Sequence, residues 1–461
     1  MIFSSIPFLY YFLPAVLLVY FAVPWKLKNT VLLLASLIFY GWGEPKLLFL
    51  MIFTIVLFWF CGLAIGRAGE REQKKVWLLI SVVISVALLG LFKYADFFIG
   101  SFNSLTGLGI PMLRLALPVG ISFYTFQCLS YTIDVYRGHV PPQRNILSFG
   151  AYVSMFPQLI AGPIVRYSDI ARQLENRTHS REAFFLGLRR FLIGLGKKVI
   201  IADNFALLMK LFRESGEKSV LFYWLYALAF LFNIYFDFSG YSDMAIGLGR
   251  IFGFHFPENF NYPYLSKSIT EFWRRWHMTL GSWFRDYVYI PMGGNRVSKG
   301  RWVFNILTVW MLTGLWHGAA WNFVAWGLFF GICLMIEKWV PALQKLPGLI
   351  RHGYVLLAVI LSFVLFNAES LTMAGQDIAG LFGFGRVPLV TPESIYYLKS
   401  YGVLFLLGIL GSTPVVKRSG SRIAQTRAGE VLEPAFLAAL LLVCTAYLVD
   451  GSFSPFLYFR F

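Results

Sequence analysis

Two histidines stand in surroundings that could support chemistry. His277 ends the motif WRRWH, within the stretch 233–296, which is dense in Arg, aromatic residues, Gly and Asn. His317 lies in TGLWHGAAW, inside the stretch 302–336, which contains no Asp, Glu, Lys or Arg. An ionisable side chain at membrane depth is costly and marks a functional site by default. Because imidazole gains and loses a proton near neutral pH, each histidine is a candidate general base.

Each histidine also has a structural interpretation. His277 follows Trp273 by one helical turn on an apolar face, where a hydrogen bond to a neighbouring carbonyl would satisfy it. His317 could pack against a neighbouring helix, as histidines do in membrane bundles. Gly314 and Gly318 favour the functional interpretation of His317, because a helix broken at both would let a backbone or a substrate approach the ring.

Two acidic residues, Asp237 and Asp243 in YFDFSGYSD, are further candidates. They could line a proton or cation path in a transporter, or they could act as helix caps and pair with nearby arginines. Pairing is the favoured interpretation, because charges within membranes usually pair. The sequence has no G-x-S-x-G elbow, Walker A motif or HExxH motif.

The element that must position His277 is predicted to be an amphipathic helix. Ser268 followed by Glu271 is a capping-box pattern that marks its start. At helical spacing Trp273, Trp276, Leu280, Trp283, Phe284 and Tyr287 share one side, whereas Arg274, Ser282 and Arg285 share the other. Aromatics opposite cations suit a helix at the membrane interface. The helix should end in a Pro/Gly/Asn turn at residues 290–295.

Composition places the whole chain in a membrane. Of its 461 residues 58% are hydrophobic and 14% charged, against about 25% charged in a soluble protein. The sequence therefore predicts an all-α polytopic membrane protein. The net charge of +17 is attributed to cytoplasmic loops and not to nucleic-acid binding. The four cysteines are isolated in apolar runs and are predicted to be core residues without disulfides: Cys61, Cys128, Cys333 and Cys444.

Apolar runs predict roughly ten to thirteen transmembrane helices. The runs are 6–23, 31–42, 47–65, 76–92, 115–136, 199–212, 220–235, 302–340, 354–366, 396–410 and 434–448. Run 302–340 should break near Gly314–Gly318. Segment 151–165 contains Pro157, Gly162 and Pro163, so it is predicted to be re-entrant or interfacial. Basic segments 166–198 and 417–427 are predicted to be cytoplasmic loops, and the lysines after the first run place the N-terminus outside.

Several long motifs resemble one family. YFDFSGYSDMAIGLG, ENFNYPYLSKSITEFWRRWHMTLGSWFRDYVYIPMGGNR and GLWHGAAWNFVAWG are similar to the membrane-bound O-acyltransferase (MBOAT) family, and within it to the bacterial alginate O-acetyltransferase branch. MIFSSIPFLYYFLP, PVGISFYTFQCLSYTIDVYRG and FPQLIAGPIVRY resemble that branch as well. The resemblance runs from the start of the chain to about Trp339, and the last hundred or so residues match only in being apolar.

The resemblance implies one polytopic domain over residues 1–461, with core motifs at 115–340 and tilted and re-entrant helices around a central tunnel. His317 occupies the position of the catalytic histidine and His277 the second polar position. The resemblance also implies a bacterial inner-membrane enzyme with no bound cofactor or metal. It would take an acyl thioester such as acetyl-CoA from the cytoplasm. The acceptor would be a hydroxyl of an exported polysaccharide, or the serine of a periplasmic or extracellular acetyltransferase partner.

Acyl transfer to a hydroxyl needs a base and a group that orients the thioester or stabilises the oxyanion. We assign His317 as the base and His277 as the orienting or polarising partner. The candidates for binding substrate or donor are Arg274, Arg275, Trp276, Arg285, Trp316 and Asn295. The arginines, and the basic segment ending at Lys198, could hold donor phosphates, or they could contact lipid headgroups.

Other functions stay open at this stage. The same chemistry could transfer D-alanyl groups or acylate peptidoglycan. A transporter or flippase would use an intramembrane polar path without acyl chemistry, but paired halves, which many transporters show, are not evident in the sequence. A third class is a scaffold without catalytic activity. The presence of both histidines argues against it.

Overall fold

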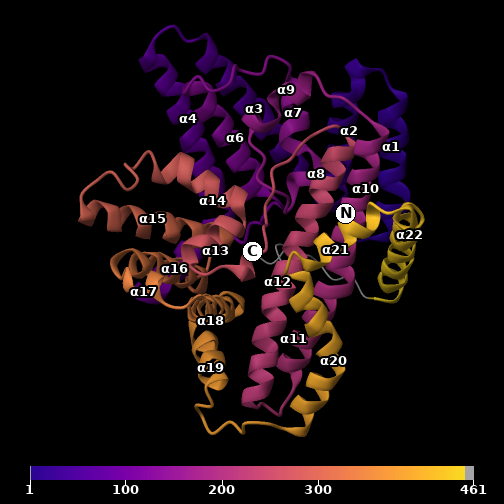
Figure 1. Cartoon of the computed structure of the whole chain (residues 1–461). Helices are drawn as coiled ribbons and strands as arrows, with labels where there is room; N and C mark the ends of the chain where they lie inside the picture. Colours follow the sequence, from indigo (N-terminus) through magenta and orange to yellow (C-terminus); the bar gives the residue numbers. More distant parts are fainter. Residues whose placement is uncertain (1, 452–461) are drawn as a thin grey trace. The chain divides into compact units, whose positions relative to one another are not determined.

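The computed structural model describes residues 2–451, and all regular structure in that range is helical. The chain forms two compact units. The first contains Met1–Phe191 and Ser242–Pro257, and the second contains Leu192–Tyr241 and Glu258–Phe461. Helix α12 (Val220–Ile251) contributes residues to both. The all-helical membrane architecture predicted from the sequence is confirmed (Figure 1).

The first unit is built around α3, which packs against α4, α6 and α7. Helix α6 begins only after Gly120, whose φ of 74° requires a residue without a β-carbon. Only residues 121–136 of the apolar run 115–136 are therefore helical. The helices are α1 (Leu13–Ala22), α2 (Lys28–Gly43), α3 (Leu48–Arg67), α4 (Arg71–Leu89), α5 (Ala95–Thr106), α6 (Ile121–Tyr136), α7 (Ile146–Ser154), α8 (Phe156–Leu159), α9 (Tyr167–Glu175) and the first turns of α10 (Arg181–Gly196).

The second unit has a large aromatic core. In Figure 1, α15 and α16 lie side by side, and α11, α12 and α20 run together, where Phe205, Phe232 and Phe405 contact one another. Besides α12, the helices are α11 (Asp203–Glu214), α13 (Ile269–Arg275), α14 (Met278–Phe284), α15 (Lys299–His317), α16 (Trp321–Trp339), α17 (Ala342–Lys345), α18 (Gly348–Asn367), α19 (Leu371–Leu381), α20 (Pro392–Gly411), α21 (Val415–Ala424) and α22 (Arg427–Asp450).

Seven helices among the described residues are long and apolar enough to cross a membrane. They are Leu48–Arg67, Arg71–Thr106, Val220–Ile251, Trp321–Trp339, Gly348–Asn367, Pro392–Gly411 and Arg427–Asp450. Pro7–Ala22 is a shorter apolar helix. Many apolar side chains stay exposed on these helices, such as Phe49 at 75% and Leu442 at 70%. Exposed apolar faces on several helices are what a surrounding bilayer would cover.

Two basic segments predicted to be loops are helical. Segment 166–198 forms α9 and α10, and segment 417–427 is largely α21. Arginine, leucine and lysine are strong helix formers, and a capping box between Arg166 and Asp169 starts α9. By contrast, residues 151–165 do not form one straight helix, as predicted, because α7 ends at Ser154 and only the single turn α8 follows.

The two acidic residues both pair with cations, as predicted, although only Asp243 pairs with an arginine and Asp237 pairs with a lysine. Asp237 lies 2.7 Å from Nζ of Lys198, and both side chains are 2% exposed. Lys198 also lies 2.7 Å from Asp203. In the first unit, Asp243 lies 2.8 Å from Nη2 of Arg190. The four cysteines are buried and free, so their prediction as core residues is confirmed too.

Candidate active site

The tight crossing of α15 and α16 positions His317. A β-carbon on Gly314 would collide with the carbonyl of Phe323, and one on Gly327 would collide with the carbonyl of Trp310. Small residues thus let the two backbones approach closely, as is common between membrane helices. Helix α15 continues through Gly314 and ends at His317, so a break at Gly314 is wrong and the chain turns only at the extended Gly318.

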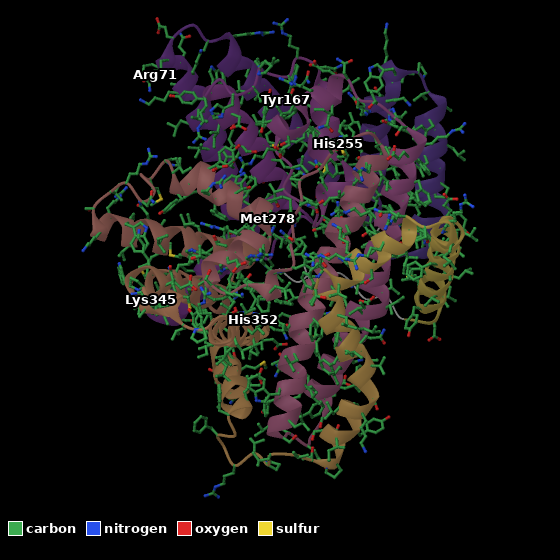
Figure 2. The ribbon with its side chains drawn as sticks, in the orientation of Figure 1. Arg71, Tyr167, His255, Met278, Lys345 and His352 are labelled. Atoms are coloured by element: carbon green, nitrogen blue, oxygen red, sulfur yellow. The ribbon has the colours of Figure 1, made fainter. Side chains whose placement is uncertain are left out.

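A break between α13 and α14 positions His277. Figure 2 labels Met278, the next residue in the chain and the first of α14. Ser268 caps α13 as predicted, its Oγ accepting from the backbone N–H of Glu271 at 2.9 Å. The single long helix predicted from the sequence is nevertheless wrong. Helix α13 ends at Arg275, and His277 takes the left-handed conformation with φ 44° and ψ 51°. A side chain other than glycine held there is strained, and such strain clusters at functional sites.

Asn259 explains the break. Its carbonyl oxygen accepts from the backbone N–H of Met278 at 3.0 Å. Its side-chain Oδ1 accepts from the hydroxyl of Thr279 at 2.9 Å and from the N–H of Thr279 at 3.3 Å. In a continuous helix, carbonyls of the preceding turn would accept from the N–H groups at the start of α14. Asn259, a residue distant in sequence, accepts from them instead, so α14 can begin without a preceding turn. Sequence reasoning missed Asn259, which lies in ENFNYPYL without any helical pattern.

The same amide sets the tautomer of His277. Oδ1 of Asn259 lies 3.1 Å from Nδ1 of His277. Since the backbone N–H of Thr279 can only donate, it selects the oxygen of the amide, and that oxygen can only accept. Nδ1 of His277 therefore carries the proton and Nε2 carries the lone pair. Nε2 is buried and has no hydrogen-bond partner among the described residues.

Burial keeps His277 neutral. Its side chain is 1% exposed, and desolvation lowers its pKa to about 3. The structural interpretation predicted a bond to a neighbouring carbonyl, and Asn259 supplies one at Nδ1. The other nitrogen is left as an unused, buried base. That combination is what a site residue needs: one nitrogen fixed by the protein and one kept for a ligand.

The structure brings the two histidines together among aromatic side chains. Their ring centroids are 6.3 Å apart at 66°. Trp316 lies 5.7 Å from His277 and 5.0 Å from His317. Trp326 and Phe366 pack against His317 at 5.1 and 5.4 Å. His317 is 3% exposed, so both imidazoles lie in the protein interior.

The remaining candidates lie elsewhere. Arg275 pairs with Glu271 at 2.9 Å, and Arg285 pairs with Asp286 at 2.7 Å. Arg274 and Asn295 are exposed and have no described contact with either histidine. The ring of Trp276 packs among Phe260, Phe272 and Phe363 and does not reach the pair. Of the six binding candidates, only Trp316 contacts the histidines.

The aromatic side of the predicted interfacial helix is buried within the protein. Trp276 and Trp283 are each 3% exposed, and Leu280 is 1% exposed. Trp276 packs on Phe363 of α18, and Phe272 of α13 packs on Phe330 of α16, so this part of the apolar pattern serves tertiary packing and not a membrane surface. Lys198 is likewise held by Asp203 and Asp237 at 2% exposure. Its proposed contact with donor phosphates is not supported by that placement.

Fold and site define an integral membrane protein with two buried histidines that lie together among aromatic side chains. Residues 38–375 match the family model described as the membrane-bound O-acyltransferase family. The chain belongs to this family and is an O-acyltransferase, as the motifs indicated. Within residues 2–451 no group of three or more His, Cys, Asp or Glu side chains is arranged to hold a metal ion.

Curated relatives include enzymes that modify different glycans. A probable alginate O-acetylase of Azotobacter vinelandii is 40% identical, and the alignment covers 100% of both chains. A peptidoglycan O-acetyltransferase of Helicobacter pylori is 33% identical and matches 100% of this chain and 98% of its own. A teichoic acid D-alanyltransferase of Bacillus subtilis is 31% identical over 55% of this chain and 67% of its own.

Proposed function

We propose that the protein transfers an acetyl group from a cytoplasmic thioester, acetyl-CoA, to a hydroxyl on the other side of a bacterial inner membrane. The acceptor is an exported, alginate-like polysaccharide or the nucleophilic serine of a partner protein that acetylates it. The observation that carries this proposal is the pair of buried imidazoles 6.3 Å apart. Full-length similarity to probable alginate O-acetylases supports the choice of acetyl group and of glycan.

In the proposed reaction, His317 is the base. It takes the proton of the acceptor hydroxyl while the oxygen attacks the thioester carbonyl. When the tetrahedral intermediate collapses, the carbon–sulfur bond breaks, and His317 returns the proton to the departing thiolate. The products are an ester and a free thiol, so atoms and charge balance. Imidazole suits both proton transfers near neutral pH.

His277 supports this step by orienting substrate. Because Asn259 holds its proton on Nδ1, Nε2 can accept a hydrogen bond but cannot donate one to an oxyanion. Of the two roles considered for His277, orientation is thus favoured over polarisation. The indole N–H of Trp326 is buried, has no hydrogen-bond partner among the described residues and belongs to the ring that packs on His317. It is the donor we assign to the developing oxyanion.

The test is CoA release from liposomes. The protein is reconstituted, acetyl-CoA labelled on the acetyl group is supplied to the face that bears the basic segments, and free CoA and label are followed. His317→Ala should insert and unfold like wild type yet release no CoA. Wild-type rates in this variant would contradict the assignment of His317. No release by the wild-type protein, even with candidate partner proteins, would favour a transporter or a different thioester.

The acceptor needs a second measurement. Label should leave CoA and appear on alginate oligosaccharide or on a partner protein only when that acceptor is supplied. Peptidoglycan fragments are the matched alternative, since a peptidoglycan O-acetyltransferase aligns over the full chain. Label on peptidoglycan alone would keep the chemistry and overturn the proposed glycan.

A further inference from the structure

A basic pocket lies in the first unit, in a part of the chain that the proposed reaction does not use. Its volume is about 390 Å³. It opens at the start of α10 and is lined by His179, Ser180, Arg181 and Arg250 together with Phe21 and Phe184. No carboxylate lines it. A concave site with two guanidinium groups, an imidazole and a hydroxyl has the chemistry of a phosphate site.

Behind the pocket lies a buried cation. Arg177 is 8% exposed. Its Nε donates to the hydroxyl of Tyr20 at 2.9 Å, and its Nη1 donates to Oδ1 of Asn29 at 2.7 Å. Its guanidinium also lies over the rings of Trp25 and Phe254, at 4.8 and 4.4 Å. Nη2 is buried and has no hydrogen-bond partner among the described residues.

The hydroxyl of Tyr20 connects this cation to the pocket. It donates its single proton to the carbonyl of Phe252 at 2.9 Å and accepts from Arg177. Nε2 of His179 lies 3.0 Å from the same oxygen. With the hydroxyl proton already used, Nε2 of His179 must be the donor in this contact. Nδ1 is then the ring nitrogen that His179 keeps for other contacts.

The cations of this region have no counter-ion among residues 2–451. Lys28, Arg177, Arg181 and Arg250 form no ion pair among the described residues. Lys28 instead donates to the carbonyl of Tyr20 at 2.8 Å and lies 4.4 Å from its ring centroid. Unpaired charge in a partly buried site is costly. An anion from outside the chain would offset that cost.

The apolar surroundings indicate which anion. Phe21, which lines the pocket, is 43% exposed, and its neighbours on α1, Leu18 and Val19, are 74% and 51% exposed. An apolar helix face beside a cationic pocket matches a ligand that joins a phosphate to acyl chains. We propose that this pocket binds the phosphate headgroup of an anionic membrane phospholipid, with its acyl chains along the exposed face of α1.

Soluble phosphates share this chemistry, so the experiment separates the sources. The full chain is reconstituted in vesicles of phosphatidylcholine alone or with phosphatidylglycerol, and the thermal unfolding midpoint and lipid affinity are measured. Phosphatidylglycerol should raise the midpoint. A rise of equal size in phosphatidylcholine with inorganic phosphate or CoA would overturn the lipid assignment.

Variants locate the effect. Arg181 is exposed and makes no described contact, so Arg181→Gln should fold normally. It should bind phosphatidylglycerol about fivefold more weakly, as should Arg250→Gln. Arg422→Gln on α21 removes the same charge from an exposed helix outside the pocket and is the matched control. Equal affinity of all three variants for phosphatidylglycerol would overturn the assignment of the site. Acetyl transfer by the two pocket variants should persist.

Discussion

Asn259 offers the sharpest test of the site, because it touches His277 and is proposed to touch neither donor nor acceptor. Asn259→Ala removes the acceptor for Nδ1–H of His277 and for the two Thr279 donors. A buried donor left unsatisfied costs about 1–3 kcal/mol. If the loss of the contact with His277 raises the activation free energy by about 2 kcal/mol, kcat drops about 30-fold. The freed ring can then rotate or change tautomer, which misplaces Nε2.

Asn259→Asp separates positioning from mere stability. The carboxylate keeps the acceptor oxygens but adds a negative charge beside Nδ1–H, which stabilises the imidazolium and raises the pKa of His277 from about 3. Below the raised pKa, Nε2 is protonated and cannot accept a hydrogen bond. Activity of this variant should therefore fall on the acid side at pH values where the wild-type protein keeps its rate.

The assay is CoA release in liposomes across a pH series, with kcat and KM determined separately and thermal unfolding measured in parallel. Thr279→Val is the matched control, since it removes one donor to Asn259 and leaves the contact with His277 in place. It should lose stability with little change in kcat. An Asn259→Ala protein with wild-type kcat at every pH would refute the positioning role, whatever happens to its stability.

Three further outcomes are expected. Gly314→Ala should destabilise the protein and slow acyl transfer, because its β-carbon would meet the carbonyl of Phe323. Gly353→Ala, with open space around it, should unfold like wild type. Equal unfolding midpoints for the two variants would contradict the close approach of α15 and α16 at Gly314. Lys198→Met should cost about 3–5 kcal/mol in the free energy of unfolding because it removes the ammonium that lies 2.7 Å from buried Asp237. Lys210→Met at the exposed pair with Glu214 should cost far less, and equal losses would refute this reasoning. His277→Ala should lower kcat strongly, and unchanged kinetics would return this residue to a structural role.

Local patterns in the sequence predicted most of the helices and one of the caps. Apolar runs such as 47–65 and 354–366 became α3 and α18, because a chain surrounded by lipid must satisfy its backbone internally. Ser268 capped α13 through a contact between residues three apart in the chain. Isolated cysteines proved to be buried thiols. Each of these features depends on neighbours in the chain, which a sequence displays directly.

Side-chain partners that the sequence pattern did not reveal account for the failures. The amphipathic pattern after Ser268 predicted one helix, but Asn259 supplies the start of α14 and splits it. Basic composition predicted that Lys198 would meet ligands or lipid, yet Asp203 and Asp237 hold it in the interior. The arginines of the WRRWH motif were predicted to bind substrate or donor, but Arg275 forms an ion pair with Glu271 on its own helix. For the helix break and for Lys198 a contact from a distant residue overrode the local signal, whereas for Arg275 the overriding partner lies one turn away on the same helix.

The sequence by itself determined the family, because its motifs occur in order along the chain, and it singled out His277 and His317 by their unusual settings. Tertiary structure alone decided that the two rings lie 6.3 Å apart, that Asn259 fixes which nitrogen of His277 carries the proton, and that only Trp316 among the proposed binders reaches them. The physical reason is that proton position and ring separation depend on hydrogen bonds and close helix crossings between distant residues, which no local pattern encodes.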